Sequence, residues 1–270
     1  MENNIKGTIA LSPPAEPCII IKKLEFSIAK HKILREISCS FDFGRINGLV
    51  GPNGSGKSTL LRNICRIWSP ERGYIYIQGK NYKKINRRQL STMLTFIPQN
   101  TQVNFSLRVF DFVAMGRHPH IKGLQSLRQK DKDVIKSSLN KTKTSHLTDR
   151  YINEISGGEA QLVSIARALA TEAPVLLLDE PTSALDIKHK LEIMELLCGL
   201  KKEGKTIIMS IHDLELARRY CDTITMLYQG GIYFSGIASV AFSQTRIKEV
   251  FDVSVREIYT DQGTSLLFYR

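Results

Sequence analysis

Short apolar runs, each about the length of a β-strand, alternate along the chain with segments in which apolar residues recur at helical spacing. A short continuous apolar run bounded by polar or turn residues is typical of a buried strand. Such runs predict strands at residues 18–21, 46–50, 74–77, 95–97, 175–178, 206–209 and 223–227.

Helical periodicity fills most of the space between these strands. Residues 57–68 are predicted to be a helix, because Leu60, Leu61 and Ile64 recur at helical spacing before Pro70 stops the pattern. Strands that alternate with helices predict an α/β fold with a mostly parallel sheet. A second helical face is formed by Ile187, Leu191, Met194 and Cys198.

The strand pattern is interrupted once. Between residues 101 and 157 the sequence becomes polar, helical and rich in lysine. We therefore expect an α/β domain over residues 18–258 with a helical subdomain inserted at about 101–160. Residues 1–17 are predicted to be a loose leader and residues 259–270 a C-terminal tail.

The basic character of the chain leaves the type of partner open. A net charge of +12 permits nucleic acid, anionic lipid or a polyanionic substrate. The densest basic runs, 128–132 and 141–143, lack interleaved aromatic residues, and acids interrupt the first of them. A solvated helical surface is the favoured interpretation, and no nucleic-acid partner is expected.

The cysteines and the apolar runs bear on the compartment. The 5 cysteines are scattered, with no CxxC spacing, which favours reduced, packed thiols in a cytoplasmic protein over disulfides or a zinc site. Every apolar run is far shorter than the ~20 residues that span a bilayer. The N-terminus lacks the apolar core of a secretory signal. Membrane contact is therefore expected through a partner or the lipid surface.

One motif predicts a nucleoside triphosphate site. Residues 51–59 fit the pattern G-x-x-x-x-G-K-[ST] between a predicted strand and a predicted helix. Glycines let backbone N–H groups surround the phosphates, and the helix N-terminus adds its dipole. Lys57 is predicted to contact the β- and γ-phosphates, and Ser58 to bind Mg²⁺. The predicted nucleotide-binding residues are Gly51, Pro52, Asn53, Gly54, Ser55, Gly56, Lys57, Ser58 and Thr59.

A pair of carboxylates follows the predicted strand at 175–178. Asp179 and Glu180 stand at its carboxyl end, where ligands bind in open α/β sheets. Asp179 is placed to support the metal through water, and Glu180 to polarise the attacking water as a general base. Together with Lys57, this pair predicts triphosphate hydrolysis.

Further motifs resemble those of the ATP-binding-cassette (ABC) family. Residues 155–159, Ile-Ser-Gly-Gly-Glu, resemble its signature, and residues 183–186, Ser-Ala-Leu-Asp, resemble its D-loop. Gln99 resembles the Q-loop glutamine and His212 the switch histidine. The motifs occur in family order and spacing, and the similarity covers roughly residues 18–258.

The resemblance implies a RecA-like P-loop NTPase core, of the α/β class, with a peripheral antiparallel sheet and an inserted helical subdomain. It also implies a homodimer that binds ATP and Mg²⁺ between its subunits. Ser156, Gly157 and Gly158 open a predicted helix, so their N–H groups form an outward-facing anion site. In the family this site caps the γ-phosphate held by the opposite subunit.

The resemblance also implies roles for individual side chains. Gln99 couples the nucleotide site to a membrane partner, and His212 contacts the γ-phosphate and senses hydrolysis. The implied catalytic residues are Glu180, His212 and Gln99. The implied metal-binding residues are Ser58, Gln99 and Asp179.

The sequence departs from the family pattern in two places. Ile155 and Glu159 stand where leucine and glutamine are usual in the signature. Ile28 stands where an aromatic residue normally stacks on adenine, so we expect base recognition to be weak, unless Phe26 or His31 supports the base.

A finer resemblance points to the branch that imports iron–siderophores, haem or cobalamin. Residues 110–120 and 251–255 resemble that branch's segments after the Q-loop and near the C-terminus. The resemblance implies transmembrane permease subunits, an external substrate-binding protein and a position on the cytoplasmic face of the membrane. The permease is expected in a cleft between the Gln99 loop and the segment 110–116, and polar changes at Phe110 or Phe112 are expected to weaken docking.

Basic and histidine residues near that cleft are predicted to have ordinary roles. Arg117 and residues 130–136 are interpreted as a solvated basic surface. His118 and His120 could suggest a metal, but with no third ligand nearby a loop or packing role is favoured.

The competing hypothesis is a non-transport ABC ATPase that acts on DNA or ribosomes, which the net charge keeps open. Such proteins carry long insertions or two cassettes. This chain has one cassette and a short spacing between Gln99 and Ser156. Transport is therefore the favoured function.

Overall fold

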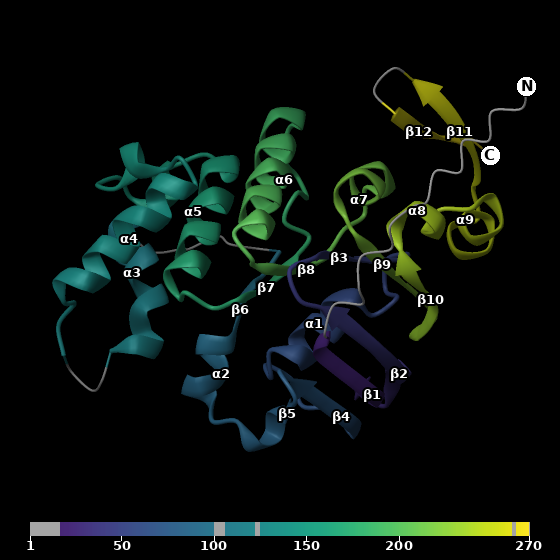
Figure 1. Ribbon diagram of the computed structural model, residues 1–270, viewed down its shortest axis with the longest axis horizontal. Helices are drawn as coiled ribbons and strands as arrows, with labels where there is room; N and C mark the ends of the chain where they lie inside the picture. The colour runs from purple at the N-terminus through teal and green to yellow at the C-terminus, as the bar shows by residue number, and fades with distance from the viewer. Residues whose placement is uncertain (1–16, 100–105, 122–124, 261–262, 270) are drawn as a thin grey trace, which may run out of the picture.

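The computed structural model describes residues 17–99, 106–121, 125–260 and 263–269. Within them, the centre of the fold is a six-stranded sheet of order β10-β9-β3-β8-β7-β6 (Figure 1). All neighbouring strands are parallel except the antiparallel pair β9–β10. Every residue of β3, β7 and β8 is buried, as expected of parallel strands covered on both faces. The strands are β3 (Ile46–Val50), β6 (Leu94–Ile97), β7 (Val175–Asp179), β8 (Thr206–Ser210), β9 (Thr223–Tyr228) and β10 (Gly231–Ile237).

A second, antiparallel sheet of order β2-β1-β4-β5 lies beside the central one (Figure 1). The predicted peripheral sheet is thereby confirmed. Its strand β2 has no apolar run, because only Leu34, Ile37 and Phe41 are buried among polar residues. The strands are β1 (Pro17–Ile28), β2 (His31–Asp42), β4 (Arg72–Ile77) and β5 (Lys80–Asn81).

The helix predicted at residues 57–68 is shorter in the structure. Helix α1 ends at Ile64, because Arg66 adopts the left-handed φ of 60° and turns the chain. The N–H groups of Ile67 and Trp68 then both donate to the carbonyl of Arg62. No helix among the described residues is long and apolar enough to cross a membrane. The helices around the sheets are α1 (Lys57–Ile64), α2 (Arg87–Met93), α6 (Ile187–Lys202), α7 (Leu214–Tyr220), α8 (Ala238–Ala241) and α9 (Gln244–Phe251).

The helical subdomain has its own apolar core beside the sheet. Residues 101–105 and 122–124 of its predicted span lie outside the described residues. Helix α5 extends beyond the predicted end of the subdomain and joins two cores: Val163 and Ala166 pack inside the subdomain, whereas Ile165 packs against the sheet. The helices are α3 (Val109–Ala114), the 3₁₀ turn η2 (Met115–His120), α4 (Gln129–Lys141) and α5 (Gly157–Ala170).

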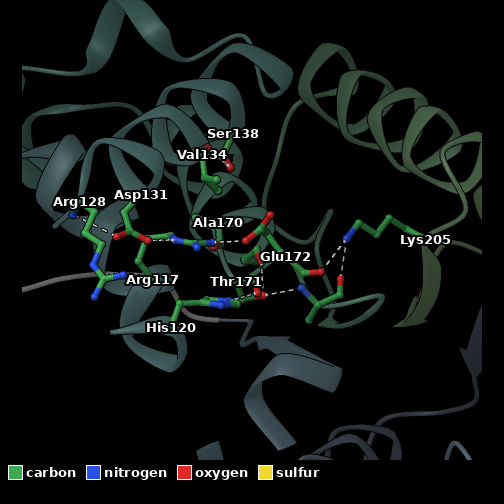
Figure 2. A network of polar contacts seen from close by, with 12 residues as sticks. Arg117, His120, Arg128, Asp131, Val134, Ser138, Ala170, Thr171, Glu172 and Lys205 are labelled. Carbon is green, nitrogen blue, oxygen red and sulfur yellow. Dashed lines mark hydrogen bonds and ion pairs between the residues drawn. The ribbon is translucent and has the colours of Figure 1, made fainter. Parts of the chain in front are cut away.

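Arg117 is buried at the base of this subdomain, so its assignment to a solvated basic surface is wrong. The side chain is 2 % exposed, and its guanidinium donates to Asp131 at 3.0 Å, to Glu172 at 2.7 Å and to the Ala170 carbonyl at 2.7 Å (Figure 2). Burial alone would raise the pKa of the Asp131 carboxyl, but the hydrogen bonds from Arg117 and from the Arg128 N–H, together with the charge of Arg117, outweigh it and hold that pKa below its usual range. These contacts fasten η2 to α4 and to the end of α5.

The C-terminal residues predicted to be a tail form a β-hairpin instead. Strands β11 (Ser254–Thr260) and β12 (Gly263–Tyr269) pair antiparallel, and the predicted boundary at 258 falls inside β11. The hairpin is held to the domain because Val255 and Leu266 join the main apolar core. At the other end, residues 1–16 of the predicted leader lie outside the described residues, and Pro17 already belongs to β1.

All five cysteines are free thiols, as the sequence predicts. Cys18 and Cys221 are fully or nearly buried, and the other three are partly buried. Burial raises the pKa of the Cys39 thiol to about 12. The thiols therefore act as small packing residues.

Candidate functional site

The phosphate loop follows β3 and leads into α1, the predicted context. Gly51 has a φ of 149°, and a Cβ there would collide with the Leu227 carbonyl oxygen. Gly56 has a φ of 103° and caps α1, while a Cβ would lie 2.7 Å from Leu34 Cδ2. Both positions therefore require glycine, for backbone angle and for space.

The loop encloses a cavity of about 230 Å³. Lys57 is buried there, and its Nζ donates to the carbonyls of Gly51 at 2.8 Å and Pro52 at 3.1 Å. Burial lowers the pKa of Lys57, while the nearby carboxylates of Glu180 and Asp179 partly counter the shift. Ser55 is buried with no hydrogen-bond partner for its hydroxyl among the described atoms. The cavity is lined by Ile33, Asn53, Gly54, Gly56, Lys57, Ser58, Thr59 and Glu180.

Asp179 stands at the end of β7, beside the first turn of α1. Its Oδ1 accepts hydrogen bonds from Ser58 Oγ at 2.7 Å and from Ser210 Oγ at 2.8 Å. Its Oδ2 is buried with no hydrogen-bond partner in the described part of the chain, and Arg62 Nη2 lies 3.8 Å away. A buried carboxylate oxygen left without a donor, next to a serine hydroxyl, suits a hard cation that prefers oxygen ligands.

Glu180, the next residue, is held from several sides. Its backbone has a left-handed φ of 49° and its N–H donates to Ser210 Oγ at 2.8 Å. Its carboxylate accepts a hydrogen bond from Gln99 Nε2 at 2.6 Å, and His212 Nε2 contacts its other oxygen. Residues predicted from three separate motifs thus meet at one carboxylate, on the rim of the loop cavity.

The signature residues form a helix start away from this cavity. Ser156 caps α5 with its side chain, which accepts a hydrogen bond from the Glu159 N–H at 3.3 Å. Glu159 Oε2 accepts in return from the Ser156 N–H and hydroxyl, both at 2.8 Å. Glu159 therefore completes a capping box, which glutamine could also form. Ser156 and Gly157 are exposed, and no residue of α5 lines the loop cavity.

Sequence reasoning missed three contributors to the site. Ser210 orients both acidic residues, Arg62 lies beside Asp179, and Ile33 lines the cavity. Only the position of Ser210 at the end of a predicted strand could have indicated its role. Serine alone carries too weak a signal.

The residues considered for adenine stacking and for metal binding make other contacts in the structure. Ile28 ends β1 and is 45 % exposed, and Phe26 stacks on Trp68 with ring centroids 5.4 Å apart. His120 Nε2 donates a hydrogen bond to the Thr171 carbonyl oxygen at 2.9 Å, so the ring has a structural role. Among the described residues, no group of three or more His, Cys, Asp or Glu side chains is arranged to hold a metal.

Comparisons with known proteins identify the family of the chain. The family model described as "ABC transporter" matches residues 34–183, which include the phosphate loop, the signature and both acids. The iron(3+)-hydroxamate import ATP-binding protein FhuC of Bacillus subtilis is 38% identical over 234 residues, 86% of this chain and 87% of its own length. The petrobactin import ATP-binding protein FpuD of Bacillus anthracis is 33% identical over 248 residues, 91% of this chain and 90% of its own.

Other relatives and solved structures extend the similarity. The cobalamin import ATP-binding protein BtuD of Halobacterium salinarum is 35% identical over 242 residues, 89% of this chain but 60% of its own length. A solved transporter assigned to the metal-chelate type, in an inward-facing conformation, matches with a TM-score of 0.82 at 25% identity, over 94% of this chain and 96% of its own. The chain therefore belongs to the ABC transporter family, as an ATP-binding subunit with ATPase activity.

Proposed function

We propose that the chain powers an importer of a metal chelate, and that two copies bind ATP and Mg²⁺ between them. The observation that carries the catalytic part is Glu180, held by Gln99 and His212 at the rim of the phosphate-loop cavity. A carboxylate there can accept a proton from the water that attacks the γ-phosphate. Lys57 and the loop N–H groups bind the phosphates meanwhile.

The residues present fit a magnesium ion. Ser58 and the unpaired Oδ2 of Asp179 would hold it, the latter directly or through water. Gln99 gives its amide N–H to Glu180, so its side-chain oxygen is the atom that would face a metal. When bound, Mg²⁺ neutralises charge on the β- and γ-phosphates.

The signature residues are proposed to serve a second copy. The start of α5 at Gly157 and Gly158 offers backbone N–H groups and a positive dipole end, which suit a phosphate, whereas the Ser156 N–H is bonded to Glu159. Gly157 is exposed, and neither glycine lines its own chain's cavity. A second copy that faces this chain would bring its γ-phosphate there and complete both sites.

We expect weak discrimination between adenine and guanine. Ile28 offers no aromatic face, and Phe26 is already stacked on Trp68. GTP should therefore compete within about tenfold of ATP, a gap of ~1.4 kcal/mol. Ile28→Tyr should tighten ATP binding, since stacking on an aromatic ring contributes about 1–3 kcal/mol. Competition of GTP with a fluorescent ATP analogue measures both effects; a strong preference for ATP in the unaltered chain would show that another group recognises the base.

A cleft of about 630 Å³ between the core and the helical subdomain is the proposed permease site. Its walls come from α2 and β6 on one side and from η2 and α5 on the other. Met115, which is 48 % exposed, lies on its wall, whereas Phe112 is buried in the subdomain core and Phe110 packs against that core. Within the predicted segment 110–116, we therefore propose Met115, rather than these two phenylalanines, as the exposed contact.

The charge of the cleft suggests the chemistry of the permease segment. Arg66, Arg87 and Arg167 line it, and the described lining residues include no aspartate or glutamate. Arg66 is tied to two backbone carbonyls and Arg167 lies over Phe112, so both guanidinium groups are fixed in place. A short helix with an apolar face and an acidic residue would fit.

The rest of the proposed system follows from the relatives, whose names specify import of iron hydroxamate, petrobactin and cobalamin. We propose the same class of cargo here, an iron chelate or a corrinoid, with haem as a further member. The chain would sit on the cytoplasmic face of the membrane, bound to transmembrane permease subunits. An external substrate-binding protein would deliver the chelate.

The docking prediction can be tested with a photo-crosslinking residue at Met115. In detergent-solubilised membranes it should label a multi-spanning protein, and deletion of the gene should reduce uptake of an iron chelate, haem or a corrinoid. Arg87→Glu should lower the crosslinking yield several-fold, because it reverses a charge inside the cleft. Lys136→Glu makes the same charge change on the exposed face of α4 and should have little effect. Salt-sensitive recovery with DNA or ribosomes instead, with uptake intact, would favour the non-transport hypothesis.

A further inference from the structure

An imidazole ring fills the space beside the second glycine of the signature. His189 lies in the first turn of α6, and Gly158 lies in the first turn of α5. A Cβ on Gly158 would stand 2.5 Å from His189 Cδ2, 2.6 Å from Cγ and 2.8 Å from Nε2. Any side chain at position 158 would therefore displace the ring. Gly157 differs, because a Cβ there would meet no atom within 4 Å.

The ring is held on its other side by Asp186, the N-cap of α6. Asp186 Oδ1 accepts hydrogen bonds from the His189 N–H at 2.9 Å and from its ring Nδ1 at 2.8 Å. Both bonds lower the pKa of the Asp186 carboxyl. The ring cannot move away from Gly158 without losing its bond to the helix cap.

Asp186 itself follows the turn that begins at Glu180. The N–H and hydroxyl of Ser183 donate to the Glu180 carbonyl at 3.1 Å and 3.0 Å, and Ala184 has a left-handed φ of 56°. The turn between the proposed base and the cap of α6 is thus held at Ser183 by two hydrogen bonds to Glu180. The His189 side chain links Asp186, which follows this turn, to the start of α5 at Gly158.

We propose that His189 is a positioning residue for ATP hydrolysis. Its ring sets the start of α5, and hence the Ser156–Gly158 anion site, relative to the Glu180 turn. Because that anion site would cap the nucleotide of the other copy, the contact links one chain's own site to the site it completes for its partner. The inference rests on the proposed shared site. It assigns the need for glycine at position 158 to a contact within one chain rather than to the nucleotide.

A ligand-binding role for His189 has less support. The ring borders a cavity of about 400 Å³, together with His146, Glu159 and Glu192. Among the described residues, these groups do not form a cluster that could hold a metal. On one side the His189 ring is bonded to Asp186, and on the other it packs beside Gly158, so its contacts are with protein atoms.

The test is a set of second-site variants made in the Glu180→Gln background, with ATP-dependent dimerisation measured by sedimentation. Gly158→Ala should weaken dimerisation by about tenfold or more, within the range of coupling between residues in contact. Adding His189→Ala should recover part of this loss, because the ring that met the new methyl group is gone. His189→Phe keeps the volume of the ring and should not restore dimerisation. Without the Gly158 change and with Glu180 intact, His189→Ala should lower kcat several-fold, because the start of α5 is no longer held in place.

Gly157→Ala is the matched control. Whatever effect Gly157→Ala has on dimerisation, adding His189→Ala should not relieve it, because no side chain stands beside position 157. ATP affinity of the single chain should be unchanged in all these variants, so the loss should appear in dimerisation, and in kcat when the same changes are made with Glu180 intact, rather than in nucleotide binding. If Gly158→Ala does not fold, recovery of folding in the double variant supports the contact, and failure to recover contradicts it.

Gly157→Asp tests the shared nucleotide site separately from the role of His189. The added carboxylate would face the partner's γ-phosphate and should abolish the dimer. A Gly157→Asp variant that still dimerises with ATP would overturn the shared site itself. If Gly157→Asp abolishes the dimer but His189→Ala fails to rescue Gly158→Ala, the shared site stands and the role of His189 is wrong.

Discussion

Glu180→Gln is expected to lower ATP turnover by about 10²–10⁴-fold, the usual contribution of a positioned general base. The amide cannot accept a proton from the attacking water. ATP binding should persist, because it depends on Lys57 and the loop N–H groups, which the substitution does not touch. The strained turn should also persist, since glutamine has the same stem and the backbone N–H still bonds to Ser210. Phosphate release and equilibrium ATP binding measure the two effects separately.

Glu195→Gln provides a control, because this exposed residue of α6 undergoes the same chemical change far from the loop cavity. Its turnover should match that of the unaltered chain. Near-normal turnover in Glu180→Gln would remove Glu180 from the role of base. Loss of ATP binding in that variant would show that the carboxylate acts mainly in holding the site together.

How much of the fold could be predicted depended on how each strand is buried. Strand β3 was predicted with its observed bounds, because both of its faces are covered and Ile46, Leu49 and Val50 leave it predominantly apolar. Strand β2 and the hairpin strand β12 were missed. In β2, buried Leu34 and Ile37 are separated by polar residues, so no continuous apolar run is present, and the alternation of Ile37 and Phe41 with serines covers only five residues.

The site was predictable where a motif fixes local backbone. The loop glycines, the capping serine and the acids after β7 all act within a few residues of their own positions. Ser210 could not be found this way, because it reaches Asp179 and Glu180 only through the pairing of β8 with β7. The same limit applies to His189, whose contact with Gly158 depends on how two helices pack.

Arg117 shows why a basic residue cannot be assigned to a surface from charge alone. Its acidic partners are Asp131, on the next helix, and Glu172, beyond the end of α5. No local sequence pattern indicates that either residue pairs with Arg117. In the folded chain these partners supply the compensation that a buried guanidinium requires.

Arg117→Met is therefore expected to destabilise the protein by about 3–5 kcal/mol, the cost of removing one partner of a buried ion pair. The variant leaves the Asp131 carboxylate nearly buried beside an apolar side chain and frees the Ala170 carbonyl. Arg108→Met, at an exposed pair with Asp149 3.9 Å away, should cost about 1 kcal/mol or less. Urea unfolding at neutral pH compares the two variants with the unaltered chain.

The pH dependence of the stability difference between Arg117→Met and the unaltered chain identifies the interaction that is lost. Arg117 holds the pKa of Asp131 below its usual range, so the stabilisation is full above the ordinary carboxyl pKa of about 4 and is lost as pH falls through the lowered value. The gap between Arg117→Met and the unaltered chain should therefore narrow in acid. Adding Asp131→Leu to Arg117→Met should recover part of the loss at neutral pH, because no unpaired carboxylate then remains. A gap that is constant with pH, with no recovery in the double variant, would mean that Arg117 stabilises the subdomain by packing and by its bond to the Ala170 carbonyl, and not by pairing with Asp131.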